Sequence, residues 1–161
     1  MDNRPNLKGI PVAGRKFFDL LYADNEFCGE LGRVMLAAGR LETELKLYLT
    51  ANSIKYNTKH ATLGDLLDLA KKQKLLTKML PALDLLRFQR NYLTHSLNAL
   101  FSGLIEETVL PRSDLLDSDI VTFTELAWQL AENLDGLAKI LAKENATYNN
   151  ALHPTRSMKR E

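Results

Sequence analysis

Cysteine is almost absent from this chain, because Cys28 is the single example among 161 residues. An internal disulfide needs two cysteines, so a disulfide-stapled scaffold is excluded and a reducing compartment is favoured. The chain also lacks a run of about 18 apolar residues, so we predict no membrane-spanning helix. No apolar segment follows a basic stretch after Met1, so we expect no secretory signal. These absences predict a cytoplasmic protein that has no membrane partner.

An excess of charge of one sign is also missing. Lysine and arginine total 21 and aspartate and glutamate 20, which gives a formal net charge of +1. Bulk charge therefore does not indicate a nucleic-acid or membrane binder, and a surface for RNA must be a local patch. His60, His95 and His153 lie far apart in the sequence, without the spacing of a zinc site. A glycine-rich phosphate loop is missing as well, and we expect no metal and no cofactor.

The chain does contain apolar residues at helical spacing along most of its length. Asp24 or Asn25 is predicted to cap a long helix, Thr62 a second helix, and Pro81 fits the first turn of a third. A last helix is predicted from about 121 to 143. The expected buried stripe of the long helix is Phe27, Leu31, Val34, Met35, Ala38, Leu41, Leu45, Tyr48 and Leu49. The expected stripe of the last helix is Phe123, Ala127, Leu130, Leu134, Leu137, Ala138 and Leu141.

This pattern predicts an all-α fold, a bundle of four to five helices within residues 24–143. Residues 1–23 carry proline and glycine at four positions, so we expect an N-terminal extension with little regular structure. Part of it, residues 17–22, is apolar enough to cover the core or a partner. Residues 102–119 are predicted to be an irregular connection, and residues 144–161 a flexible tail.

One polar cluster interrupts the leucine-rich helix predicted after Pro81. Asn91 and His95 are four residues apart, so they share a helix face and the amide can orient the imidazole. Arg90 and His95 are five residues apart, which places them about 140° apart around the helix. The long arginine stem can nevertheless bring the guanidinium into the same cleft.

The segment Arg90-Asn91-Tyr92-Leu93-Thr94-His95 resembles the signature of the HEPN family, which is arginine, a polar residue, three further residues and histidine. The likeness in helix order covers roughly residues 24–143, and its specific part is these six positions. It implies an up-down helical bundle that forms a homodimer, with the two motif helices lining one cleft. Many HEPN proteins are metal-independent ribonucleases, often toxins or defence effectors, and others have no known cleavage activity.

The resemblance implies a role for each motif residue. His95 is the acid/base group for attack of a ribose 2′-hydroxyl on the neighbouring phosphate, since imidazole exchanges protons near neutral pH. Arg90 holds the phosphate through its planar, permanently charged fork. Asn91 fixes the histidine tautomer or contacts the phosphate. Outside the family match, candidate RNA-binding residues are Arg87, Lys71, Lys72, Lys74 and Lys78.

Other interpretations stay open. The motif can be an ordinary surface pattern in which Arg90 forms a salt bridge and His95 a local hydrogen bond. Leu63-Gly64-Asp65-Leu66 is similar to a helix start in the mannitol operon repressor group, which implies a non-enzymatic regulator that binds another protein. For a toxin the expected protein partner is an antitoxin, and for a regulator it is another regulatory protein. Trp128 lies off the stripe of the last helix and is a candidate for the dimer interface or for packing at the core edge. The chain end from Ala151 resembles the ends of integron gene-cassette proteins.

Overall fold

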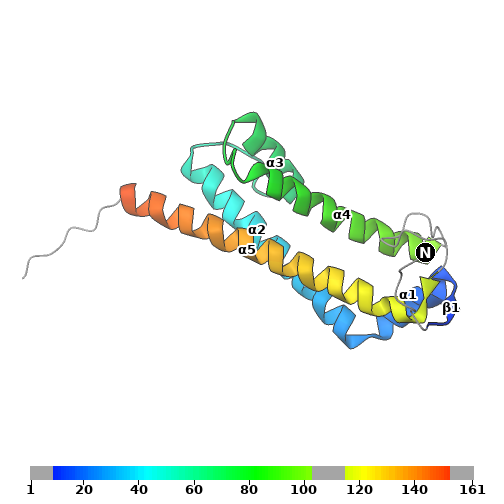
Figure 1. The fold of residues 1–161 in the computed structure, drawn as a ribbon. Coiled ribbons are helices and arrows are strands. Elements are labelled where there is room, and N and C mark those ends of the chain that lie inside the picture. The colour runs from blue at the N-terminus through cyan, green and yellow to red at the C-terminus, as the bar shows by residue number, and fades with distance from the viewer. Residues whose placement is uncertain (1–8, 103–114, 153–161) are drawn as a thin grey trace, which may run out of the picture.

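Residues 9–102 and 115–152 are described by a computed structural model of the chain, and five α-helices account for most of them (Figure 1). The predicted all-α helical bundle is therefore confirmed. None of the described helices is both long and apolar enough to cross a membrane. In chain order the elements are β1 (Pro11–Val12), α1 (Gly14–Ala23), α2 (Asn25–Ala51), α3 (Leu63–Lys72), α4 (Leu80–Ser102), β2 (Leu115–Leu116), a 3₁₀ turn (Asp117–Asp119) and α5 (Ile120–Leu152).

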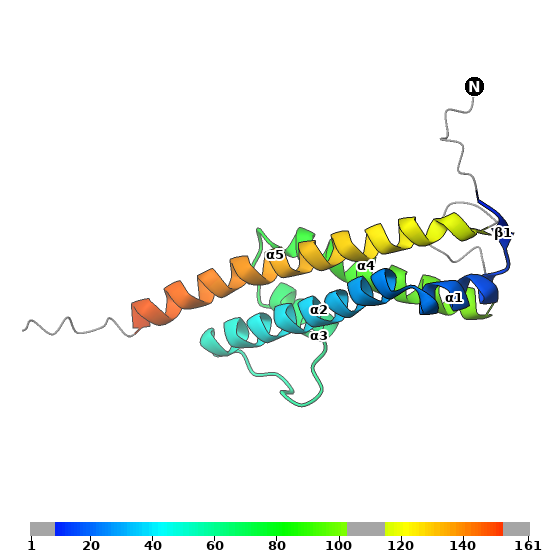
Figure 2. The same ribbon diagram turned by 90° about the horizontal axis from the view of Figure 1, so that it is seen from below.

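Helices α2 and α5 form the long axis of the molecule and run in the same direction, whereas α4 runs the opposite way (Figures 1 and 2). Two polar contacts fix the register between the parallel pair. Arg40 of α2 forms an ion pair with Asp135 of α5. Further along both helices, the Asn145 amide nitrogen donates to the Glu44 backbone oxygen at 3.1 Å and to Glu44 Oε2 at 2.8 Å.

Helix α2 begins as predicted, because the Asp24 carboxylate accepts a hydrogen bond of 2.7 Å from the Phe27 backbone N–H. Most of its predicted stripe is buried, but Met35 is 72% exposed, so its assignment to the core was wrong. Successive residues project about 100° apart around a helix. The core covers Val34, and Met35, one residue further round the helix, therefore points out of it.

Helix α1 lies in the segment predicted to have little regular structure, so that expectation was wrong for residues 14–23. Its residues Phe17 and Leu21 are fully buried in the same core as the other helices. The free energy gained by burying Phe17 and Leu21 outweighs the tendency of the nearby glycine and proline residues to disfavour a helix. The strand before α1 pairs antiparallel with β2, with Pro11 opposite Leu116, a ladder too short to leave a period-two pattern in the sequence.

Helix α3 starts with the predicted capping box. The Asp65 backbone N–H donates to the Thr62 hydroxyl at 3.3 Å, and the Thr62 backbone N–H donates to the Asp65 carboxylate at 2.9 Å. The hydrogen bond from the Thr62 backbone holds the pKa of Asp65 below its ordinary value, with help from the Thr62 hydroxyl. This box orients α3 where it packs on α2 and α4.

Helix α5 extends nine residues past the end predicted at 143, so the first part of the predicted tail is helical. The reason is tertiary, because Asn145 is buried and bonded to α2. The rest of the predicted tail, residues 153–161, lies outside the described residues. The same holds for residues 103–114, which make up most of the predicted irregular connection.

Candidate functional site

The candidate site lies on the middle of α4, where a buried leucine ladder fixes which side chains face outward. Leu83, Leu86 and Leu93 are at most 5% exposed and hold the inner side of this helix against the core. Asn91 and His95 are exposed, and their spacing on a continuous helix places them on a common outer face. The predicted sharing of one face by Asn91 and His95 is therefore confirmed.

Arg90 follows the spacing of the inner leucines of α4, and its guanidinium contacts the side chain of Asn91. Arg90 Nε and Nη2 donate to Asn91 Oδ1 at 3.3 Å and 3.0 Å. The amide oxygen of Asn91 therefore faces the guanidinium, and the described residues show no hydrogen bond between Asn91 and the His95 ring. The structure brings Arg90 to Asn91, and Asn91 to the face of His95.

The electrostatic setting of Arg90 differs from that of its neighbour Arg87. Arg87 pairs with Asp68 of α3 at 2.8 Å and with Asp84 at 3.4 Å, so its charge is balanced by two carboxylates. Within the described residues, Arg90 has no carboxylate at ion-pair distance, and its partner Asn91 is neutral. Arg90 is thus a cation whose charge is open to an anionic ligand, whereas Arg87 ties α4 to α3.

The lysines proposed to guide RNA lie away from this cluster. Lys71 is 3.9 Å from Asp84, beside the first turns of α4, and Lys72, Lys74 and Lys78 are exposed around the α3–α4 connection. A helix rises about 1.5 Å per residue, so His95 lies about 20 Å along α4 from its first residue. The structure therefore does not gather these lysines and the motif at one place.

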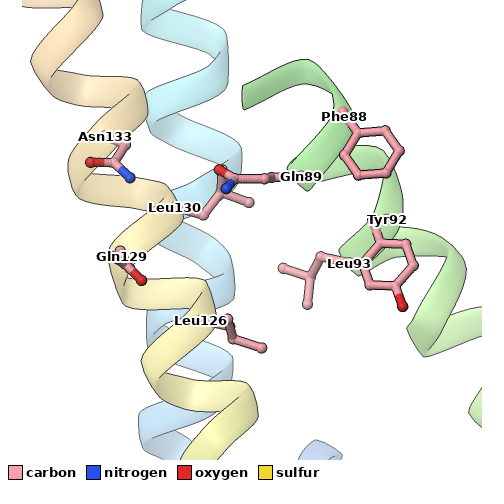
Figure 3. Close-up of a pocket in the computed structure, with 8 residues that line it drawn as sticks. All are labelled: Phe88, Gln89, Tyr92, Leu93, Leu126, Gln129, Leu130 and Asn133. Atoms are coloured by element: carbon pink, nitrogen blue, oxygen red, sulfur yellow. The ribbon is translucent and has the colours of Figure 1, made fainter. Parts of the chain in front are cut away.

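A pocket that the sequence reasoning missed opens between α4 and α5, on the side of α4 next to the motif. It encloses about 280 Å³. Figure 3 shows Gln89 and Leu93 extending from α4 toward α5. Phe88 and Tyr92, on the outer side of α4, stack with ring centroids 6.0 Å apart. The lining residues are Phe88, Gln89, Tyr92, Leu93, Leu126, Gln129, Leu130 and Asn133. In the sequence, the pocket is indicated only by Phe88 and Tyr92, two aromatic residues four positions apart that lie off the leucine stripe of α4.

Trp128 lies on another side of α5, beside the beginning of α2. Its side chain is 48% exposed, next to Val121 at 69%, and it lines a hollow of about 520 Å³ with Glu26 and Glu30 of α2. The prediction that Trp128 lies off the main stripe is confirmed. Its role in a dimer remains a prediction.

Within residues 9–102 and 115–152, histidine, cysteine and acidic side chains form no group of three or more that could hold a metal ion. Comparison with protein-family models, with curated proteins and with solved structures gives no match for the chain.

Proposed function

We propose that this chain is a HEPN-type endoribonuclease of the cytoplasm, which cleaves RNA without a metal as a homodimer and serves as a toxin or defence effector. The observation that carries the proposal is the setting of Arg90. Its guanidinium is held by the neutral Asn91 oxygen, and no described carboxylate neutralises it. A phosphate is the ligand that such a planar fork binds best. His95 is exposed on the adjoining face of the same helix.

Together with the same groups of a second copy, these side chains can carry out transesterification at phosphorus. The imidazole of His95 takes the proton of a ribose 2′-hydroxyl, and the 2′-oxygen forms a bond to the adjacent phosphorus. The bond from phosphorus to the 5′-oxygen then breaks, and that oxygen receives a proton from the imidazolium of the second copy. Arg90 stabilises the charge that develops on the phosphate oxygens. The products are a 2′,3′-cyclic phosphate and a 5′-hydroxyl.

A dimer supplies the second imidazole that this proton balance uses. We propose that α4 of each copy lines one shared cleft. Trp128 lines the hollow beside the beginning of α2 and not the pocket beside the motif, so a dimer contact through Trp128 is an alternative to this cleft. Light scattering after size-exclusion chromatography tests this step, because a monomer at micromolar concentration contradicts it.

The test is cleavage of mixed single-stranded RNA in EDTA by the wild type and by Arg90→Ala and His95→Ala. Arg33→Ala and His60→Ala are matched controls, because both residues are exposed and lie on other parts of the molecule. Wild-type cleavage that both motif variants lose, and both controls keep, supports the proposal. Circular dichroism verifies that all five proteins are equally folded. No cleavage by a folded wild-type dimer contradicts the proposal.

A second candidate function is a non-enzymatic regulator, similar to the mannitol operon repressor group, that binds another regulatory protein. The observation that favours it is the apolar outer side of α4, where Leu85 is 55% and Phe88 64% exposed. Exposed apolar patches mark interaction surfaces in soluble proteins. Under this alternative the wild type does not cleave RNA, and Phe88→Ala weakens capture of the partner protein.

A further inference from the structure

The polar groups that line the pocket between α4 and α5 are all neutral. Three side-chain amides reach it, from Gln89 of α4 and from Gln129 and Asn133 of α5, and none of its eight lining residues is charged. None of these three amides has a hydrogen-bond partner among the described residues. Each amide offers both donors and an acceptor, so the pocket can match a ligand edge that carries both.

The shape of the pocket restricts the ligand further. Its volume of about 280 Å³ lies just below the range of about 300–1,000 Å³ that drug-sized ligands occupy. One small ring system fits such a space. The rings of Phe88 and Tyr92 lie at its rim, on the outer side of α4, where they are 64% and 42% exposed (Figure 3). Exposed aromatic rings of this kind stack unpaired bases in proteins that bind single-stranded RNA.

The pocket and the motif share one turn of α4, so a single ligand can contact both. Gln89 directly precedes Arg90, and Tyr92 directly follows Asn91. A neutral pocket therefore adjoins an arginine whose charge no described carboxylate balances. A nucleotide has the same division, since its base is neutral and its phosphate is anionic.

We infer that this pocket binds one unpaired base of the RNA whose phosphate Arg90 holds, with Phe88 and Tyr92 stacking on the base and the three amides reading its edge. The inference rests on the proposed ribonuclease function and names its substrate as single-stranded RNA with a base preference. An aliphatic side chain from a protein partner is the poorer occupant, because it would bury the amides without hydrogen bonds.

Binding of a non-cleavable substrate tests the pocket separately from catalysis. Four fluorescent hexanucleotides, uniform in A, C, G or U and methylated on every 2′-oxygen, are titrated against the wild type by anisotropy. The variants are Gln129→Leu and Asn133→Leu, which keep the side-chain volume nearly unchanged. Gln73→Leu is the matched control, since this exposed glutamine lies at the end of α3, outside the pocket.

The wild type is expected to prefer one of the four bases, and either amide variant to reduce that preference by about tenfold, while Gln73→Leu leaves it unchanged. Phe88→Ala is expected to weaken binding of all four oligonucleotides by about fivefold or more, as loss of one stacked base does.

If the amide variants bind each of the four oligonucleotides as tightly as the wild type does, and the wild type cleaves ordinary RNA, the base-binding role of the pocket is overturned while the ribonuclease function stands. No binding and no cleavage by the wild type overturn both. Conversion of a dimer to a monomer by Phe88→Ala, with RNA affinity unchanged, assigns this surface to a second copy and overturns the inference.

Discussion

The rings of Phe17 and Phe123 meet edge to face, with their centroids 5.3 Å apart and their planes at 61°. Both side chains are fully buried, and the contact joins α1 to α5. Edge-to-face pairs add a favourable electrostatic contribution to the apolar area that they bury. The first helix is therefore part of the core and not an appendage to it.

Phe17→Ala is expected to lower the free energy of unfolding by about 3–5 kcal/mol, because it leaves a cavity between α1 and α5. Urea denaturation followed by circular dichroism measures the change. Tyr22→Ala is the matched control on the same helix, since Tyr22 is 79% exposed, and it should change stability by less than about 0.5 kcal/mol. Equal effects of the two variants would contradict a core position for α1.

Arg87 and Arg90 are expected to separate stability from activity. Arg87→Met removes one ion pair between α3 and α4 and one within α4, and it should cost about 0.5–1 kcal/mol of stability, as partly exposed pairs do. Arg90→Met loses only hydrogen bonds to a neighbouring amide, so it should cost less while RNA cleavage falls by about 100-fold or more. Chemical denaturation and a cleavage assay on both variants check this. A larger stability loss for Arg90→Met would identify Arg90 as a structural residue.

The capping box of α3 is expected to make stability depend on acid pH. The pKa of Asp65 is lowered in the folded protein, first by the hydrogen bond from the Thr62 backbone. Its contribution is therefore fully present above the unfolded pKa of about 4 and is lost as pH falls through the folded value. Thermal unfolding is measured between about pH 3 and about pH 6, a range that includes the unfolded pKa. The melting temperature of Asp65→Asn should depend less on pH than that of the wild type. Parallel curves for the two proteins would refute the assignment.

Asn145 is expected to hold the last turns of α5 on α2. Asn145→Ala removes two hydrogen bonds to Glu44 and should cost about 1–3 kcal/mol, because the partly buried Glu44 oxygens lose this donor. Hydrogen exchange should then speed up after residue 143. Thr147→Ala is the control, since this exposed hydroxyl bonds only within its own helix. Unchanged exchange in the asparagine variant would show that α5 holds without this contact.

The local features of the fold could be predicted because their causes are local. The Asp24 cap, the Thr62–Asp65 box and the leucine spacing of α4 each depend on residues a few positions apart. The common face of Asn91 and His95 follows from the same helical geometry. Long amphipathic helices in turn leave few architectures besides a bundle.

The sequence by itself thus determined helices α2 to α5, most of their buried stripes and the composition of the motif. Only the tertiary structure decided that α1 enters the core, that Met35 leaves it and that α5 continues past residue 143. Tertiary packing likewise brought Asp68 of α3 to Arg87 and set Gln129 opposite Gln89 across a pocket. The physical reason is that burial and charge pairing depend on which helix faces which, and that choice is made by contacts between residues far apart in the chain.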